Sequence, residues 1–292
     1  MIFGNIDSAS ISVQTICREL TNILKKGKIE NAAGEARFIL EHITGKSYPI
    51  LILECTSISE SDIKKAEDFC KRRIEGEPLQ YILGNWDFFG MTFKVGKGLL
   101  IPRSDTEVLA EEAIKSREGF EHTNYVDLCS GSGCVAAAVA KYVKGLNGSA
   151  VEKSKEAFEY LKENLEKLAP NITPCLGDVL LKSTAEKYNE LDLITANPPY
   201  LTAADMKALQ KEVTFEPELA LFGGDDGLMF YREITRIWKD SLKSDGMLLF
   251  EVGIGQYKDV IKILEENNFC DISFARDLAG IERVVMGKLK PA

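Results

Sequence analysis

The sequence contains very little histidine and no clustered cysteine. Only two histidines occur among 292 residues, His42 and His122, and neither has the spacing of a metal ligand. The seven cysteines are scattered and odd in number, and none forms a Cys-x-x-Cys pair. Scattered thiols of this kind are typical of reduced core residues rather than of disulfide frameworks or zinc sites. We therefore expect no metal site and no chemistry based on histidine.

Long apolar runs and an excess of basic residues are also missing. No apolar stretch is long enough to span a bilayer, and Met1 to Ser10 lack the basic and apolar regions of a signal peptide. We therefore expect a cytoplasmic protein without a membrane partner. The formal net charge is -9, whereas proteins that bind long stretches of nucleic acid usually carry a basic surface. Direct binding of nucleic acid is accordingly not expected.

The first 83 residues have the pattern of a small helical bundle. Apolar residues recur there every three or four positions in three stretches, and a glycine follows each stretch. Ser59 and Asp62 form a predicted capping box ahead of the third stretch. Acidic and basic residues nearly cancel in this region. The pattern predicts a helical domain over residues 1–83, with helices over residues 13–24, 32–43 and 63–74.

The period changes after Gly84. Large apolar residues then alternate with polar ones on both sides of Gly90, which predicts a β-hairpin within a linker over residues 84–103. Ser104 and Glu107 form a second predicted capping box, and a helix is expected to begin there. Residues 104–292 form the predicted third region.

From Tyr125 onward, short apolar strands alternate with helices. Repeated strand–helix units predict an α/β fold with a mostly parallel sheet and helices on both faces. Such sheets bind ligands beyond the carboxyl ends of their strands. The predicted strands cover residues 125–128, 149–151, 172–176, 191–196, 247–252, 270–274 and 283–286, and the helices 135–143, 154–168, 228–242 and 257–267.

A glycine-rich loop follows the first of these strands. Its sequence is Asp127-Leu128-Cys129-Ser130-Gly131-Ser132-Gly133. Glycine permits backbone angles and a close ligand approach that a side chain would prevent, and the helix that follows offers free amides. The segment from Gly131 also satisfies the dinucleotide pattern G-x-G-x-x-A. The loop therefore predicts a nucleotide-like cofactor without identifying it.

Acidic residues follow the next two strands. Glu152 stands where a carboxylate can accept hydrogen bonds from both ribose hydroxyls. Asp178, followed by Val179, could accept a hydrogen bond from an adenine amino group. Together with the glycine-rich loop, these positions predict a pocket for adenosine. They leave open whether the cofactor is a nicotinamide dinucleotide or S-adenosylmethionine.

The segment Asn197-Pro198-Pro199-Tyr200 favours S-adenosylmethionine. It directly follows the predicted strand over residues 191–196. Consecutive prolines stiffen the backbone and remove two amide donors, so the remaining polar groups are acceptors: the Asn197 side-chain oxygen and the Pro198 carbonyl. Two rigid acceptors can hold a planar NH2 group with one face toward a methyl donor, and Tyr200 can pack on a flat substrate.

With this tetrapeptide and the segments around it, the sequence resembles the HemK/PrmC family, the N5-glutamine methyltransferases of peptide chain release factors. The resemblance covers nearly the whole chain, including its helical first region. The tetrapeptide is shared with adenine and guanine N-methyltransferases, and the flanking segments narrow the resemblance to this family. The matching segments are residues 76–84, 100–107, 197–200, 215–217, 223–228 and 281–284.

The resemblance implies a class I Rossmann-like methyltransferase with a seven-stranded sheet. It also implies S-adenosylmethionine as cofactor, S-adenosylhomocysteine as product, and the glutamine of a Gly-Gly-Gln motif in a release factor as substrate. The helical domain would then dock this protein partner. The implied cofactor-binding residues are Asp127, Cys129, Ser130, Gly131, Ser132, Gly133, Glu152, Asp178, Val179 and Asn197. The implied substrate-binding residues are Asn197, Pro198, Pro199, Tyr200 and Glu216, of which Asn197, Pro198 and Tyr200 are expected to be catalytic.

The sequence departs from the family pattern at three places. Cys129 replaces the usual glycine, Glu152 the usual aspartate, and Ser104-Asp105 the usual Pro-Glu. The Cβ of Cys129 is expected to narrow the space for the methionine part of the cofactor. The longer Glu152 must retract to reach the ribose.

Three other functions are consistent with parts of the pattern. An RNA or DNA N-methyltransferase could use the same tetrapeptide, but it needs a basic track and a flipped base. A catalytically idle S-adenosylmethionine-binding module would bind the cofactor without forming product. A nicotinamide-dependent dehydrogenase would need a proton donor for hydride chemistry, and the sequence offers no obvious one.

Overall fold

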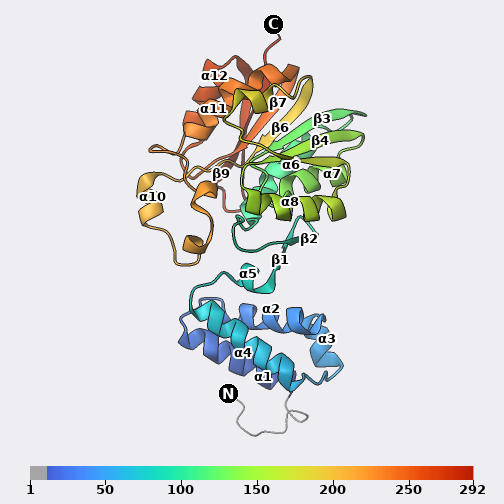
Figure 1. Cartoon of the computed structure of the whole chain (residues 1–292), viewed down its shortest axis with the longest axis vertical. Helices are drawn as coiled ribbons and strands as arrows, with labels where there is room; N and C mark the ends of the chain where they lie inside the picture. The colour runs from blue at the N-terminus through green and yellow to red at the C-terminus, as the bar shows by residue number, and fades with distance from the viewer. Residues whose placement is uncertain (1–11, 292) are drawn as a thin grey trace. The chain divides into compact units, whose positions relative to one another are not determined.

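The computed structural model describes residues 12–291. The predicted absence of a signal peptide concerns Met1 to Ser10, which lie outside the described residues. The chain forms two compact units, shown in Figure 1. Unit 1 contains the residues up to Gly84 and also the short segment Lys211–Phe215, whereas unit 2 contains Asn85–Gln210 and the residues from Glu216 onward. The five-residue segment means that the chain leaves unit 2, enters unit 1 and returns.

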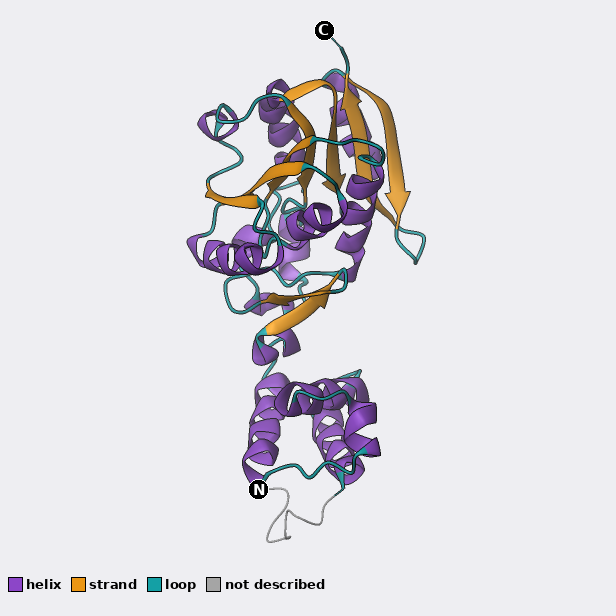
Figure 2. Ribbon diagram, turned by 90° about the vertical axis from the view of Figure 1, so that its right-hand side faces the viewer, coloured by secondary structure: helices purple, strands orange, loops and turns teal. Residues whose placement is uncertain are grey.

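Unit 1 is helical, as the purple ribbons in Figure 2 show. The three helices predicted from apolar spacing are confirmed, and two short helices were not predicted. In order, the helices are α1 (Val13–Lys26), α2 (Ala32–Thr44), α3 (Tyr48–Leu53), α4 (Glu60–Ile74) and α5 (Leu79–Leu83). The apolar stripes of α1 and α2 form the core, in which Ile16, Leu20, Leu24, Ile39 and Leu40 are fully buried.

The capping box predicted for α4 forms only in part, because Ser59 caps the helix but the Asp62 carboxylate binds the Ser59 hydroxyl. The Ser59 hydroxyl oxygen accepts a hydrogen bond from the Asp62 backbone N–H at 3.1 Å and donates one to the Asp62 carboxylate at 2.7 Å. This satisfies one of the free amides at the start of the helix. Sequence-local signals of this kind therefore define the helices of unit 1.

Unit 2 begins with the predicted hairpin. Strands β1 (Asn85–Phe88) and β2 (Met91–Lys94) pair antiparallel and form a ribbon separate from the large sheet (Figure 2). Phe88 and Phe93 are buried and join the core on one side of that sheet. The alternation of apolar residues around Gly90 is thus confirmed as a strand signal.

The large sheet has seven strands in the order β5-β4-β3-β6-β7-β9-β8. The five strands from β5 to β7 are parallel, and β9 runs antiparallel to both β7 and β8. The predicted mostly parallel seven-stranded sheet is therefore confirmed. Its strands are β3 (Thr123–Leu128), β4 (Leu146–Glu152), β5 (Ile172–Leu176), β6 (Leu191–Ala196), β7 (Leu242–Glu251), β8 (Phe269–Arg276) and β9 (Glu282–Leu289).

Helices cover both faces of this sheet (Figure 1). One face packs against α6 (Glu107–Lys115), α7 (Cys134–Tyr142) and α8 (Lys155–Leu168), and the other against α9 (Lys182–Ala185), α11 (Met229–Trp238) and α12 (Tyr257–Glu266). Successive strand residues alternate between the two cores: Tyr125 belongs to the first and Val126 to the second. The short helix α10 (Ala203–Lys207) lies in the connection from β6 to α11.

Two local predictions are wrong. Ser104 and Glu107 do not form a capping box: residues Ser104–Thr106 form a 3-10 turn, and α6 begins after it without a side-chain cap. The Glu107 carboxylate accepts instead from the Phe89 backbone N–H at 2.8 Å. A contact with the hairpin therefore replaces the local cap.

The helix predicted over residues 228–242 is also too long. It ends at Trp238, a 3-10 turn follows at Lys239–Ser241, and β7 already begins at Leu242. The Ser241 hydroxyl is buried and donates to the Ala185 carbonyl at 3.2 Å, which holds the chain in the turn.

Within residues 12–291, no helix combines the length and apolar character that crossing a membrane requires.

Candidate active site

A cavity lies at the carboxyl ends of the central parallel strands. Residues that follow β3, β4, β5 and β6 all contribute to its lining. This is the edge at which parallel α/β sheets usually bind ligands. The lining includes all of the ten predicted cofactor-binding residues except Gly133, namely Asp127, Cys129, Ser130, Gly131, Ser132, Glu152, Asp178, Val179 and Asn197.

The glycine-rich loop turns sharply between β3 and α7. Gly133, which caps the N-terminus of α7, has a φ of 80°, and a Cβ there would lie 2.8 Å from Leu161 Cδ1 on α8. Glycine is therefore required both for the backbone angle and for the close packing of α8. Cys129, at the position where the resemblance expects glycine, has a φ of 56°. A non-glycine residue in the left-handed region is uncommon and marks a strained position.

Asp127 is buried beneath this loop. Its carboxylate accepts hydrogen bonds from the Ser130 hydroxyl and, at 2.7 Å, from the Thr195 hydroxyl on β6. Burial raises the pKa of Asp127 to about 7, although these two hydrogen bonds act in the opposite direction. The carboxylate thus ties the end of β3 and the loop to the neighbouring strand.

Glu152, at the end of β4, is retracted toward the backbone. One of its carboxylate oxygens accepts from the Gly131 N–H at 2.9 Å, and the other accepts from the Ser154 N–H at 2.7 Å. The side chain is only 9% exposed, and burial raises its pKa against the effect of the backbone hydrogen bonds. Each oxygen retains a lone pair for a ligand. The longer side chain is therefore accommodated, and it fixes the shape of the glycine-rich loop.

Asp178 and Val179 line the cavity beyond β5. The Asp178 carboxylate accepts from the Leu180 N–H at 3.0 Å and pairs with the Lys153 ammonium at 2.9 Å. Lys153 also lines the cavity. A carboxylate accepts hydrogen bonds, so Asp178 offers the cavity an acceptor suited to an amino-group donor.

Asn197 and Pro199 line the same cavity from the end of β6. The Asn197 side-chain nitrogen donates to the Thr106 hydroxyl oxygen at 3.3 Å. With its nitrogen engaged, the side-chain oxygen of Asn197 is the polar atom left for a ligand. The structure therefore brings Asn197 and the predicted cofactor-binding residues to one cavity.

Pro198 and Tyr200 do not line this cavity. Pro198 is buried, and the Tyr200 ring packs against the core on the α11 side of the sheet. The Tyr200 carbonyl accepts from the Gln256 side chain at 3.0 Å, and burial raises the pKa of the Tyr200 hydroxyl to about 12. In this arrangement Tyr200 supports the tetrapeptide from the α11 side of the sheet, outside the cavity lining.

Glu216 also lies outside the lining. Its buried carboxylate pairs with Arg103 and accepts from the Ile101 N–H at 3.2 Å. Arg103 and Ile101 do line the cavity, as does Pro217, the next residue in the chain. Glu216 therefore supports the site, because its carboxylate holds two parts of the cavity wall together.

Two buried residues beside Asn197 were not found from the sequence. Thr106 accepts the Asn197 hydrogen bond, and Glu251, at the end of β7, faces both Thr106 and Asn197. Burial raises the pKa of Glu251 to about 7, while Thr106, Arg283 and Asn197 lower it. A charged residue that ends the apolar strand β7 was a usable signal, because β7 adjoins β6 and its carboxyl end lies at the same sheet edge.

The described residues hold no group of three or more His, Cys, Asp or Glu side chains that could bind a metal ion. The seven cysteines are all free thiols. Burial raises the pKa of the Cys129 thiol well above its usual value, so this thiol is a weak nucleophile despite its place in the cavity.

Two family models match the chain in separate regions. The PrmC N-terminal domain matches residues 15–84, and a family described as Conserved hypothetical protein 95 matches residues 108–227. The first match covers the helices of unit 1, and the second covers the glycine-rich loop and the tetrapeptide of unit 2.

Curated relatives extend over most of the chain. A release factor glutamine methyltransferase of Geobacter sulfurreducens is 37% identical over 269 residues, which are 91% of this chain and 93% of that protein. A protein of the same name from Fusobacterium nucleatum is 36% identical over 270 residues, covering 91% of this chain and 75% of that protein. The similarity therefore includes both units.

A solved structure supports the fold alone. The catalytic domain of hMettl16, determined in complex with the MAT2A 3'UTR hairpin 6, has a TM-score of 0.54 and 14% sequence identity. The likeness covers 80% of this chain and 83% of that chain.

Proposed function

This chain belongs to the family of release factor glutamine methyltransferases, and we propose that it methylates the side-chain nitrogen (N5) of the glutamine in the Gly-Gly-Gln motif of a release factor. The methyl donor is S-adenosylmethionine, and the second product is S-adenosylhomocysteine. One observation carries the proposal: Asn197, at the start of the Asn-Pro-Pro-Tyr segment, lines the same cavity as the glycine-rich loop and Glu152.

The cavity suits S-adenosylmethionine by the chemistry of its donors and acceptors. Glu152 and Asp178 are carboxylates on neighbouring strand ends, where they can accept from ribose hydroxyls and from an adenine amino group. Val179 and Phe230 add apolar walls for a flat base. The glycine-rich loop brings the backbone close to the ligand, although Cys129 narrows that approach.

When bound, S-adenosylmethionine supplies an electrophilic methyl group on a positively charged sulfur. The protein has to hold the substrate nitrogen in line with it. A glutamine amide is a weak nucleophile because its lone pair is delocalised into the carbonyl. The Asn197 side-chain oxygen would accept one hydrogen of the NH2 group and orient its face toward the methyl group. The second proposed acceptor is the Pro198 carbonyl, although Pro198 does not line the cavity in this structure.

These two acceptors also act on the charge that develops during transfer. The nitrogen becomes more positive as the new N–C bond forms and the S–CH3 bond breaks, and it then releases one proton to water to give the neutral N-methyl amide. Preorganised acceptors stabilise charge where it appears. Alignment of two reactants can lower the barrier by about 7–11 kcal/mol. Positioning is therefore the main contribution assigned to Asn197 and Pro198, while Tyr200 holds the tetrapeptide in place.

The intact release factor is the proposed partner, and unit 1 is the proposed docking unit. A helical surface with nearly balanced charge suits a protein better than a phosphate backbone. Release factors act in the cytoplasm, so the reaction is proposed to take place there.

Mass spectrometry of a release factor tests the proposal. Incubation with enzyme and S-adenosylmethionine should add the mass of one methyl group to the glutamine of the Gly-Gly-Gln peptide. Asn197→Ala should lower turnover by several orders of magnitude and weaken cofactor binding only modestly, whereas Asn147→Ala, at an exposed position of β4, should behave like the wild type. Ribosomal RNA and DNA serve as parallel substrates. Methylation of a nucleic acid but not of the release factor would contradict the assignment.

A further inference from the structure

A long loop follows the Asn-Pro-Pro-Tyr segment in the connection from β6 to α11. Backbone hydrogen bonds hold the two ends of this loop together. The Leu201 N–H donates to the Leu221 carbonyl at 2.9 Å, and the Gly223 N–H donates to the Leu201 carbonyl at 2.8 Å. Between these points the chain contributes Lys211–Phe215 to unit 1. It then returns to line the active-site cavity with Pro217, Leu219 and Ala220.

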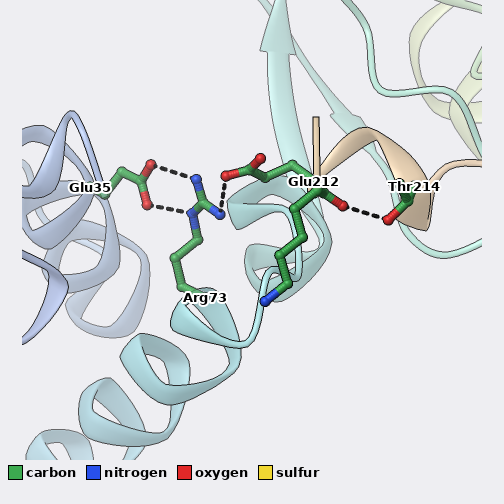
Figure 3. A network of polar contacts seen from close by, with 5 residues as sticks. Glu35, Arg73, Glu212 and Thr214 are labelled. Atoms are coloured by element: carbon green, nitrogen blue, oxygen red, sulfur yellow. Dashed lines mark hydrogen bonds and ion pairs between the residues drawn. The ribbon is translucent and has the colours of Figure 1, made fainter. Parts of the chain in front are cut away.

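Within unit 1, Arg73 holds this segment (Figure 3). The Arg73 guanidinium on α4 makes two hydrogen bonds to the Glu35 carboxylate on α2, at 2.7 and 3.2 Å. Its remaining terminal nitrogen donates to the Glu212 carboxylate at 3.0 Å. The Arg73 side chain is only 10% exposed, and the Glu35 side chain 13%. The Arg73–Glu35 pair is therefore a buried, charge-assisted contact, which is stronger than an exposed ion pair. The Glu212 side chain is 38% exposed, so its bond joins a partly exposed carboxylate to a buried guanidinium.

The segment itself is a tight turn. The Thr214 hydroxyl donates to the Lys211 carbonyl at 2.6 Å, and the Phe215 N–H donates to the Glu212 carbonyl at 3.1 Å. The stem of Lys211 lies over Gly76, where a Cβ would approach Lys211 Cε to 2.5 Å. The turn is therefore fixed both by its own hydrogen bonds and by packing at the end of α4.

A second anchor follows four residues later. Glu216 is buried against Ile101 and Arg103 in the cavity wall. Four residues span at most about 14 Å even when fully extended, and here part of them forms a 3-10 turn. The chain between the anchor in unit 1 and the anchor at the cavity is thus short and has little slack.

We propose that Arg73 is a positioning residue for the reaction: by holding Glu212, it fixes the cavity wall at residues 217–220 so that a release factor docked on unit 1 presents its glutamine to a formed site. The inference rests on the proposed function for the identity of the substrate. The tether itself rests only on the contacts of Glu212 and Glu216. Arg73 touches neither substrate nor cofactor in this scheme, and it acts through the turn.

The test removes Glu212 and leaves Arg73 in place. In Glu212→Ala the two bonds from Arg73 to Glu35 remain, so the thermal midpoint should change little. Limited trypsin digestion of the full-length protein should cut after Lys211 about ten-fold faster than in the wild type, once the rates are divided by those of unfolded peptides that carry Glu or Ala at position 212, because a released segment opens more often. Cleavage after Lys207, which is already exposed on α10, should not change. Mass spectrometry of the fragments distinguishes the two sites.

Kinetics on the intact release factor give the second measurement. The kcat/KM of Glu212→Ala for the release factor should fall about ten-fold, while the Kd for S-adenosylmethionine, measured by calorimetry, stays that of the wild type. Asp225→Ala is the matched control, because Asp225 is an exposed carboxylate on the same connection and lies outside the cavity wall. It should leave both the cleavage rates and the kinetics unchanged.

Each result decides one point. Unchanged cleavage after Lys211 would overturn the tether, and faster cleavage with unchanged kcat/KM would overturn the positioning role of Arg73. An equal loss in Asp225→Ala would also overturn that role, since any acidic residue of the connection would then suffice. If the wild type methylates no release factor, the proposed function and the positioning role both fail, and the cleavage rates still decide whether the tether exists.

Discussion

The Asn197 side-chain nitrogen donates to the Thr106 hydroxyl across 3.3 Å, which links the end of β6 to the turn that precedes α6. The two residues are 91 positions apart in the sequence. An asparagine side chain can rotate to exchange its oxygen and nitrogen, and only one orientation presents the oxygen to a substrate amide. The Thr106 hydroxyl accepts from the Asn197 nitrogen, and the Glu251 carboxylate faces the same two residues. Thr106 therefore helps to hold the Asn197 amide in place although it lies far away in the sequence.

Replacement of Thr106 by valine tests this relationship. Valine keeps the shape of threonine but removes the acceptor, so the Asn197 amide should lose its fixed orientation and kcat should fall about ten-fold, the effect of one lost hydrogen bond. The Kd for the cofactor should change little. Steady-state kinetics on the release factor measure the loss, and Thr106→Ser, which keeps the hydroxyl, should recover most of it. A valine variant with normal kcat would show that Asn197 is oriented by other contacts.

Glu152→Gln should weaken cofactor binding rather than catalysis. A carboxylate can accept from both the Gly131 and the Ser154 N–H groups, but a carboxamide has only one oxygen. The glycine-rich loop should therefore loosen, and the Kd for S-adenosylmethionine should rise about ten-fold. With saturating cofactor, kcat should stay near that of the wild type. Calorimetry and kinetics together check this, and a changed kcat with an unchanged Kd would assign Glu152 a different role.

Gly133→Ala should destabilise unit 2 through two effects. The φ of 80° is unfavourable for alanine, and the new Cβ would meet Leu161 at 2.8 Å. Backbone strain alone costs about 1–3 kcal/mol, and the overlap with Leu161 should add to it. Gly119→Ala is the comparison, because Gly119 has a φ of 83° with no atom within 4 Å of its Cβ position. Urea unfolding of both variants should therefore show the larger loss for Gly133→Ala, and equal losses would contradict the packing argument.

Glu251 should make folding stability depend on pH. Burial raises its pKa in the folded protein to about 7, compared with 4.5 for the ordinary glutamate. The folded state then binds this proton more tightly than the unfolded state does. The contribution to stability is present below the ordinary pKa, and it is lost as the pH rises through the folded value.

Comparison of the wild type with Glu251→Gln isolates this contribution. The wild type should lose free energy of unfolding, on the order of a few kcal/mol, between about pH 5 and about pH 8. Glutamine cannot ionise, so the variant should lose less over the same interval. Urea titrations at a series of pH values measure the difference. Parallel curves for the two proteins would show that Glu251 ionises with an ordinary pKa.

The features that sequence predicted well depend on neighbours in the chain. The stripes of α1 and α4, the strand at residues 191–196 and the loop ending at Gly133 are visible as local periodicity or as glycine at a strand end. The rule that parallel strands bind ligands at their carboxyl ends then placed Glu152 and Asn197 at one edge. These predictions needed no knowledge of which distant residues meet.

The features that were missed depend on contacts between distant segments. Arg73 and Glu212 are 139 positions apart, and neither residue differs locally from any charged surface residue. The cap predicted at Ser104 failed because the Glu107 carboxylate is bound by the hairpin. The resemblance located Glu216 near the substrate, but only the structure shows that its carboxylate is engaged by Ile101 and Arg103. Polar side chains with several possible partners cannot be assigned from sequence alone.

The helical unit is not a contiguous stretch of sequence, because Lys211–Phe215 is part of it. An exchange of the first 84 residues between two relatives would thus combine one protein's Arg73 with the other's turn. In such chimaeras the contact between Arg73 and the turn would not match, unless the five residues Lys211–Phe215 are transferred together with the helices. Within this chain, a change at Glu35 or Arg73 would alter the contacts of a turn that lies far downstream in the sequence.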